Sequence, residues 1–283
     1  MLTKCVVWCI VSGVAMAQTA APNSAATNGQ AAARDSRDRA QGQISELERK
    51  AGSGDQVAQY QLALAYESGK GVAQDYEKAI RWYTIAANRG FPAAQNNLAA
   101  MYAGGIGVKK DSSAALMWYM RAATEGDSAA QNNLGTFYAS GEATARDDEE
   151  AVRWFRKAAD AHFGPALANL AMMYSQGRGV IADAVSATRY YEAAADDGFV
   201  AAMEPLGFRY ADGVGVARDA KLAIKWLERA ANTGSTTAIA KLTALLEQEG
   251  SRGDEVARAK ASYWRARVVE TKAASSQTGE GHR

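Results

Sequence analysis

The stretch DQVAQYQLALAYESGKGVAQDYEKAIRWYTIAANRG, residues 55–90, is one copy of a pattern that recurs along the chain with neither insertion nor deletion. A leucine returns every 36 residues, at Leu62, Leu98, Leu134, Leu170, Leu206 and Leu242. A tyrosine follows four residues after the first five of these leucines, and a further aromatic residue keeps the same step from Trp82 to Trp226. A fixed period of this length is typical of a chain built from stacked structural repeats.

The spacing of apolar residues within the quoted unit predicts two helices. Ala58, Leu62 and Tyr66 stand four residues apart, which places them on one stripe of a first helix. Residues 79–87 contain the matching stripe of a second helix, and a glycine-rich turn at 69–72 separates the two. Each hairpin leaves one face uncovered until the next hairpin stacks on it. We therefore expect an all-α solenoid of antiparallel helix pairs.

Capping residues recur with the same period. Aspartate stands before each second helix, at Asp75, Asp111, Asp147, Asp183 and Asp219. Its carboxylate can accept a hydrogen bond from the free amide groups of the first turn. Glycine closes four of the second helices, whereas the third unit has His162 at this position. The third unit also has Ala143 where its neighbours have glycine, so we expect its turn to be distorted.

The repeat divides the chain into segments. Five full units are expected at 55–90, 91–126, 127–162, 163–198 and 199–234. A half-repeat at 44–54 precedes them, and a degenerate capping repeat at 235–271 follows. Residues 18–43 and 272–283 contain hardly any large apolar side chain, so we expect a disordered leader and a disordered tail.

The N-terminus has the pattern of a secretory signal. Lys4 precedes an apolar run over residues 5–14, and Ala15-Met16-Ala17 fits the small-residue cleavage site. We expect cleavage after Ala17 and a periplasmic or secreted protein, without stable membrane insertion after cleavage. A retained signal acting as a membrane anchor is the alternative. Both cysteines of the chain, Cys5 and Cys9, lie inside this segment, so the predicted mature protein has no thiol chemistry.

The recurring residues of the 36-residue unit resemble a known type of helical repeat. The pattern A-x-x-x-L-G/A-x-x-Y-x-x-G-x-G-V-x-x-D, followed by A-x-x-W-Y-x-x-A-A-x-x-G, resembles the Sel-one-like repeat (SLR), a relative of the tetratricopeptide repeat. The resemblance implies a right-handed superhelical solenoid and a role as an adaptor, regulator or assembly scaffold. Bacterial proteins of this kind are often exported. One exported branch has a disulfide in each repeat, and this chain lacks those cysteines.

Catalytic and metal-binding interpretations find little support. The predicted mature chain has two histidines, His162 at a helix cap and His282 in the tail, and neither has a nucleophile spaced to partner it. We therefore expect no enzyme activity, no metal and no cofactor. The 32 basic and 31 acidic side chains give no electrostatic footprint for nucleic acid. An exported enzyme acting on cell-wall glycan or a β-lactam is the alternative, from activities proposed for relatives.

Positions that vary between repeats are the candidates for specificity. The first helices are expected to line a concave face that binds a partner protein or peptide. The candidate partner-binding residues are Tyr60, Leu64, Glu67, Asn96, Asn132, Thr136, Met172, Glu204 and Phe208. The alternative is that these side chains only support the superhelix. For the repeating Asn97, Asn133 and Asn169 we favour a structural role in bonding the backbone over a role in binding.

Overall fold

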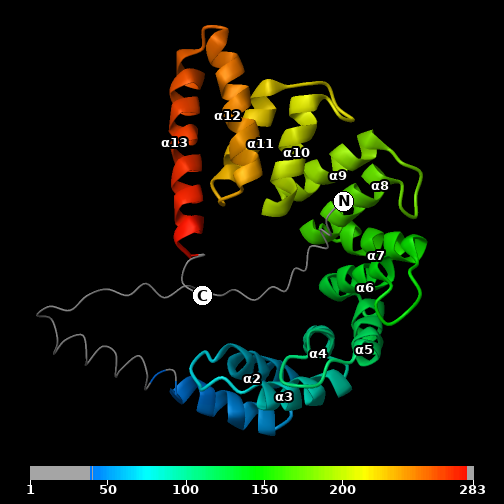
Figure 1. The fold of residues 1–283 in the computed structure, drawn as a ribbon. Helices are drawn as coiled ribbons and strands as arrows, with labels where there is room; N and C mark the ends of the chain where they lie inside the picture. The colour runs from blue at the N-terminus through cyan, green and yellow to red at the C-terminus, as the bar shows by residue number, and fades with distance from the viewer. Residues whose placement is uncertain (1–38, 40, 279–283) are drawn as a thin grey trace, which may run out of the picture. The chain divides into compact units, whose positions relative to one another are not determined.

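The computed structural model describes the backbone of residues 39 and 41–278. Within this part of the chain all regular structure is helical (Figure 1). A helix over residues 41–52 comes first. The others are α2 (Gln56–Ser68), α3 (Tyr76–Asn88), α4 (Pro92–Gly104), α5 (Ser112–Thr124), α6 (Ser128–Ser140), α7 (Asp148–Asp160), α8 (Gly164–Gln176), α9 (Ala184–Asp196), α10 (Val200–Asp212), α11 (Ala220–Ala231), α12 (Thr236–Ser251) and α13 (Glu255–Thr278).

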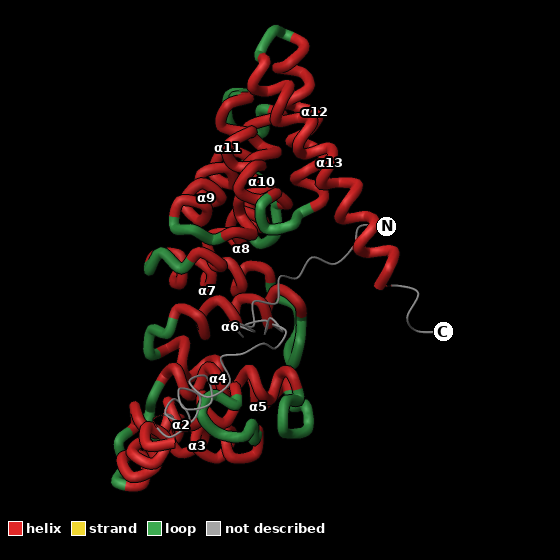
Figure 2. The backbone as a smooth tube through the Cα atoms, turned by 90° about the vertical axis from the view of Figure 1, so that its left-hand side faces the viewer, coloured by secondary structure: helices red, strands yellow, loops and turns green. Residues whose placement is uncertain are grey.

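The described residues form two compact units, one that ends at Asp147 and one that begins at Asp148. In the first unit α2 packs on α3 and α4 on α5, and α3 and α5 in turn pack on the helix that follows each of them. In the second unit each helix from α7 to α12 packs against the helix that follows it, with short loops between them (Figure 2). Because these contacts join neighbours along the chain, each unit has the all-α solenoid architecture that the repeat predicts.

The periodic leucines form the centre of the packing. Leu62, Leu98, Leu134, Leu170, Leu206 and Leu242 each have 0% of their surface exposed. The alanines at Ala58 and its equivalents are buried beside them, and their small side chains let the helices approach closely. The aromatic columns belong to the core only in part: Tyr66 and Trp226 are buried, whereas Trp82, Tyr102 and Tyr174 are half-buried.

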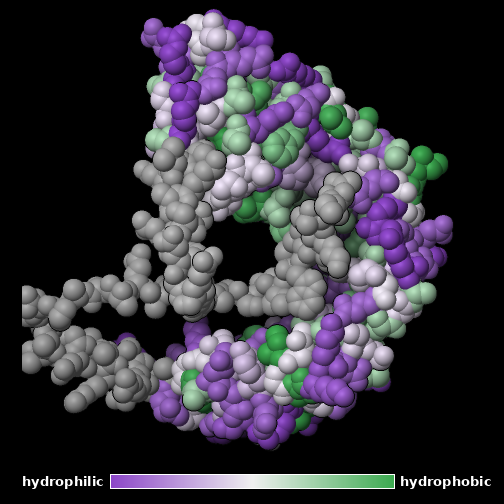
Figure 3. Space-filling view, in the orientation of Figure 1, coloured by the Kyte–Doolittle hydropathy of each residue, from purple (hydrophilic) through white to green (hydrophobic). Residues whose placement is uncertain are grey.

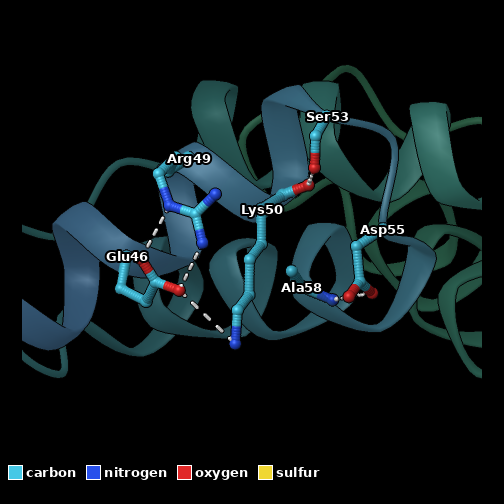
Figure 4. Close-up of polar contacts among 6 residues, drawn as sticks. All are labelled: Glu46, Arg49, Lys50, Ser53, Asp55 and Ala58. Carbon is cyan, nitrogen blue, oxygen red and sulfur yellow. Dashed lines mark hydrogen bonds and ion pairs between the residues drawn. The ribbon is translucent and has the colours of Figure 1, made fainter.

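The expected aspartate caps are confirmed for four of the second helices. The side chains of Asp75, Asp111, Asp183 and Asp219 accept a hydrogen bond from a backbone amide in the first turn of α3, α5, α9 and α11. Asp55 caps the first helix α2 in the same way, through the amide of Ala58 (Figure 4). Each cap satisfies one amide that has no partner inside the helix.

The turn inside each repeat needs a left-handed residue. A Cβ on Gly179 would lie 2.1 Å from the carbonyl oxygen of Asp148, so a side chain there would collide with the start of α7. Gly71, Gly107, Gly179 and Gly215 all have positive φ. The expected distortion of the third turn is wrong, because Ala143 adopts the same conformation with φ 65°. The fold imposes this backbone on alanine, at a steric cost.

The ends of the helical region differ from the expected segment boundaries. Helical structure begins at residue 41, inside the segment expected as leader. Helix α13 continues to Thr278, past residue 272, where the tail is expected to begin. Ala257, Ala261 and Trp264 of α13 are buried against the preceding helices, so the packed part of this helix supports the turns that follow it. The signal segment 1–17 lies outside the described residues.

Candidate partner-binding surface

The candidate residues fall on the first helix of each repeat, in two groups. Tyr60, Leu64 and Glu67 lie on α2, Asn96 on α4, and Asn132 and Thr136 on α6, all within the first unit. Met172 on α8 and Glu204 and Phe208 on α10 lie in the second unit. Most are half-buried, and Leu64 is the most open at 36% exposed. A surface made of these side chains is therefore described within each unit separately.

Asn132 does not fit the open surface on which it is expected. It is only 5% exposed. It lies on α6, which contacts both α4 and α5, and its burial leaves little of the side chain for a partner to contact. Placing Asn132 among the partner-contacting residues is wrong for this reason.

A chain of polar side chains links three helix pairs of the first unit. The Tyr83 hydroxyl donates to a Glu67 carboxylate oxygen at 2.5 Å, and the Asn97 amide donates to the Tyr83 oxygen at 3.1 Å. Asn96 donates to the Asn97 side-chain oxygen at 3.2 Å, and Asn133 donates to the Asn96 oxygen at 3.0 Å. Residues from α2, α3, α4 and α6 therefore meet in one continuous hydrogen-bonded line.

Burial raises the pKa of Tyr83 far above its usual value, and the neighbouring Glu67 carboxylate raises it further. The hydroxyl consequently stays protonated and keeps donating to Glu67. Tyr60 packs beside this line, with its ring centroid 5.9 Å from that of Tyr83 and 5.3 Å from that of Phe91. The first-unit surface thus combines a rigid aromatic base with half-exposed amides.

The hydrogen bonds from side chains to the backbone come from a column of glutamines and not from the expected column of asparagines. Asn97 and Asn133 bond to side chains. The buried Gln59, Gln95 and Gln131 instead donate to the carbonyl oxygens of Ala51, Ala87 and Ala123, each eight residues earlier. These glutamines tie each first helix to the end of the preceding helix. Their recurrence every 36 residues is a signal that could have identified them.

The second unit has a more apolar surface at the corresponding positions. Phe208 is half-buried against the core, and the Lys241 ammonium lies 5.9 Å from its ring centroid. The Glu204 carboxylate accepts hydrogen bonds from Ser235 and Thr237, so it fastens α10 to the start of α12. Met172 is half-buried on α8. These contacts leave Met172 and Phe208 as the partly accessible apolar side chains of the candidate set in this unit.

Sequence reasoning also missed Arg209, a buried cation in a column otherwise filled by apolar side chains such as Met173. The guanidinium is 7% exposed and donates to Ser175 Oγ at 2.7 Å, Thr188 Oγ1 at 3.1 Å and the Ala184 carbonyl oxygen at 3.1 Å. Burial lowers the pKa of Arg209. These neutral acceptors hold the guanidinium in place between α8, α9 and α10, which makes it a structural residue.

The described part of the chain contains no group of three or more His, Cys, Asp and Glu side chains that could hold a metal ion. None of its helices is both long enough and apolar enough to cross a membrane. His162, with 81% of its side chain exposed, lies 3.5 Å from the Asp197 carboxylate at the end of its turn. Its position is that of a helix-ending residue.

Comparison with known families identifies the repeat. The Sel1 repeat matches five consecutive segments, residues 56–91, 92–127, 128–163, 164–199 and 200–235. The chain belongs to the Sel1 repeat family. Proteins built from Sel1 repeats are generally protein–protein interaction scaffolds and are generally not enzymes. The matched segments begin one residue after the expected units.

Two solved structures are similar to this Sel1 repeat chain. A protective antigen present in uropathogenic Escherichia coli strains, which displays an SLR fold, is 33% identical with a TM-score of 0.72, over 79% of this chain and 48% of the antigen. This chain thus spans about half the length of that antigen. A Sel1 repeat protein from Oxalobacter formigenes is 33% identical with a TM-score of 0.65, over 75% of this chain and 84% of that protein. The comparison with curated proteins gives no match.

Proposed function

We propose that this Sel1 repeat chain is a non-catalytic scaffold of the bacterial cell envelope that binds a segment of a partner protein on its first-helix surface. We define the first-helix surface as the accessible side chains of α2, α4 and α6 in the first unit; those of α8 and α10 belong to the second unit and are treated separately. The periodic leucines and the alanines at Ala58 and its equivalents are buried in the core. Specificity therefore rests on the accessible side chains of the first helices.

The main support for this proposal is the hydrogen-bonded line formed by Glu67, Tyr83, Asn97, Asn96 and Asn133 in the first unit, which we call the amide line. Asn96, Asn97 and Asn133 are half-buried, and each donates one hydrogen bond within the line although a primary amide has two hydrogens. An amide also offers an acceptor oxygen, so it matches both the N–H and the C=O groups of a peptide backbone. Leu64, three residues before Glu67 on α2, supplies an exposed apolar side chain.

Envelope location is supported by the N-terminal sequence, in which Lys4, an apolar run and Ala15-Met16-Ala17 follow one another. The test is mass spectrometry of the protein recovered from a periplasmic extract. We expect Gln18 as the first residue. A protein that keeps Met1 and remains in the cytoplasmic fraction contradicts this location.

The binding surface can be tested with a photo-crosslinking amino acid placed at Leu64 in living cells. The matched control is Ile85, an aliphatic residue on the second helix α3 with nearly the same exposure, 38% against 36%. We expect a discrete crosslinked product from position 64 and little from position 85. Products of equal yield from both positions, or from position 85 alone, would contradict the assignment of the first-helix surface.

Part of the amide line can be removed by a double substitution. Replacing Asn96 and Asn133 together by alanine removes both groups of one hydrogen bond, whereas the half-buried Asn97 loses one donor and keeps its own bond to Tyr83. We expect the crosslink at position 64 to weaken while the helical circular dichroism signal is retained. An undiminished crosslink would show that the amides do not contact the partner.

A further inference from the structure

The fourth repeat departs from the others in its turn and at the start of its second helix. Ile181 is 91% exposed and Val185 is 65% exposed. At the position of Ile181 the other repeats have Ala73, Lys109, Ala145 and Ala217, and at the position of Val185 they have Glu77, Ser113, Glu149 and Lys221. Ala182 likewise stands where Gln74, Lys110, Arg146 and Arg218 occur. Among the five repeats, only the fourth has a large aliphatic residue at the position of Ile181 and an apolar residue at the position of Val185.

The apolar turn forms one side of a shallow hollow within the second unit. The hollow has a volume of about 490 Å³ and is lined by Arg156, Tyr174, Val180, Ile181, Ala182 and Asp183. Figure 3 shows strongly hydrophobic atoms at the surface over the turn between α8 and α9. The space suits one or two side chains and is too small for a packed helix.

One arginine, Arg156, is among the residues that line the hollow, and a second, Arg189, lies near its aromatic residues. Arg156 Nη2 donates to the Tyr174 hydroxyl oxygen at 2.8 Å, and the guanidinium lies 5.9 Å from the Tyr174 ring centroid. Tyr174 is stacked on Tyr190 at a centroid distance of 5.5 Å, and Arg189 lies 5.6 Å from the Tyr190 ring centroid. Neither arginine makes an ion pair within the described residues. Two positive charges thus flank an ordered pair of aromatic rings.

The tyrosines equivalent to Tyr174 in the first and fifth repeats donate to a carboxylate, and Tyr174 has no such carboxylate partner among the described residues. In the fifth repeat the Tyr210 hydroxyl donates to the Glu192 carboxylate, and in the first repeat Tyr66 donates to Glu48 at 3.0 Å. Arg156, on α7 of the third repeat, stands at the position that Glu192 has in the fourth repeat, so it meets Tyr174 where Glu192 meets Tyr210. The Tyr174 hydroxyl therefore accepts a hydrogen bond instead of donating one, and its proton remains available. An incoming carboxylate would receive hydrogen bonds from both Arg156 and Tyr174.

Asp183 is the one carboxylate among the lining residues. It already accepts hydrogen bonds from the Val185 amide at 2.9 Å and the Ser186 hydroxyl at 2.6 Å. Each of its oxygens can accept a second hydrogen bond, which suits an N–H group of a ligand. The hollow thus offers donors for a carboxylate, an acceptor for an N–H group and an apolar wall.

We propose that this hollow, the fourth-repeat hollow, binds the C-terminal residue of a partner peptide whose last side chain is apolar. The α-carboxylate, the amide N–H and the side chain of such a residue all branch from a single Cα atom. One small hollow can therefore satisfy all three, whereas an internal acidic residue places its carboxylate on a separate side chain from the apolar group. The residues of the hollow belong to the second unit and those of the amide line to the first, so the two proposals share no residue.

The test uses the purified protein and an array of immobilised heptapeptides with free C-termini, in which the last two residues are varied over all amino acids. We expect binding to concentrate on peptides that end in Leu, Ile, Val or Phe. Amidation of the C-terminus should weaken the binding of these peptides about tenfold or more, because it removes the charged acceptor. Arg156→Gln and Ile181→Asp should each weaken it by about as much.

The matched control is Arg153→Gln, which removes another exposed arginine of α7 that pairs with Glu150. This variant should bind like the unaltered protein, and thermal unfolding should show that all variants fold. Equal binding of amidated peptides, selection of internal Asp or Glu regardless of the terminus, no preference for apolar-ended peptides, or full binding by Arg156→Gln would each overturn the proposal. None of these outcomes bears on crosslinking at Leu64, so the two proposals fail separately.

Discussion

The hydroxyl of Tyr83 donates a 2.5 Å hydrogen bond to the carboxylate of Glu67 while it accepts a bond from Asn97. Tyr83 comes from the second helix of the first repeat, Glu67 from the first helix of the same repeat, and Asn97 from the repeat that follows. The Tyr83 side chain is fully buried. This one hydroxyl therefore joins two neighbouring repeats at the base of the first-helix surface.

Tyr83→Phe should destabilise the protein by about 1–3 kcal/mol, because Glu67 and Asn97 lose their shared partner in a partly buried place. The free energy of unfolding in urea measures the change. Tyr76→Phe, at an exposed tyrosine of the same helix, is the control and should change it little. A Tyr83→Phe protein as stable as the original would show that the network contributes nothing to stability.

The same tyrosine should make the protein sensitive to alkali. Its pKa is raised in the folded state, so above pH 10 the unfolded chain releases a proton that the folded chain retains. The stabilisation is complete below the ordinary pKa of 10.0 and is lost as the pH rises above it. Stability measured across this range should fall less steeply in Tyr83→Phe. Parallel curves for the two proteins would contradict this cause.

His162→Gly should stabilise the third repeat by about 1 kcal/mol, because His162 adopts φ 55°, a conformation that costs an L-residue about that much. The substitution also removes the 3.5 Å contact of the exposed His162 side chain with the Asp197 carboxylate, and an exposed contact of this kind contributes little to stability. Gly126→Ala, at an equivalent position with φ 92° and open space around it, should destabilise to a similar extent. Thermal unfolding of the three proteins measures both changes, and a lower melting temperature for His162→Gly would exclude the strain.

The turns give a second pair of opposite effects. Ala143→Gly should raise stability by roughly 1 kcal/mol, since Ala143 holds a positive φ of 65°. Gly179→Ala should lower it by at least about 2 kcal/mol, because the new Cβ would lie 2.1 Å from the Asp148 carbonyl oxygen. Urea unfolding compares the two, and a neutral Gly179→Ala would mean that the turn can move away from α7.

Because Asp75 caps α3, we expect the free energy of unfolding to decrease as the pH falls into the acid range. Its hydrogen bond from the Lys78 amide lowers the pKa of Asp75 below the ordinary 3.8, so the stabilisation is present above that pH and is lost as the pH falls through the lowered pKa. Asp75→Asn keeps an acceptor that does not titrate, and it should flatten the decline in stability between neutral pH and about pH 3. Asp75→Ala removes the cap and should be less stable throughout. If stability decreases with falling pH in Asp75→Asn as much as in the original protein, then other carboxylates cause the decrease.

Much of the fold could be predicted from the sequence because the same helix-hairpin pattern occurs five times. The buried leucines, the aspartate caps and the glycine-rich turns each solve a requirement of one hairpin, and such requirements depend on residues close in sequence. The expectation of a distorted third turn is wrong because it rests on the backbone preference of Ala143 alone. Packing of the hairpin holds this residue in the strained conformation.

The candidate surface depended on contacts between repeats, which the periodic pattern does not contain. The sequence by itself determined the helix pairs, their caps and the residues that must be buried. Only the tertiary structure decided that Asn132 is buried, that Asn96 bonds to Asn133 from the next repeat, and that Arg156 on α7 meets Tyr174 on α8. The physical reason is one of range. Helix formation and capping act over a few residues along the chain, whereas exposure and hydrogen-bond partners are set by side chains about 20 to 40 positions away.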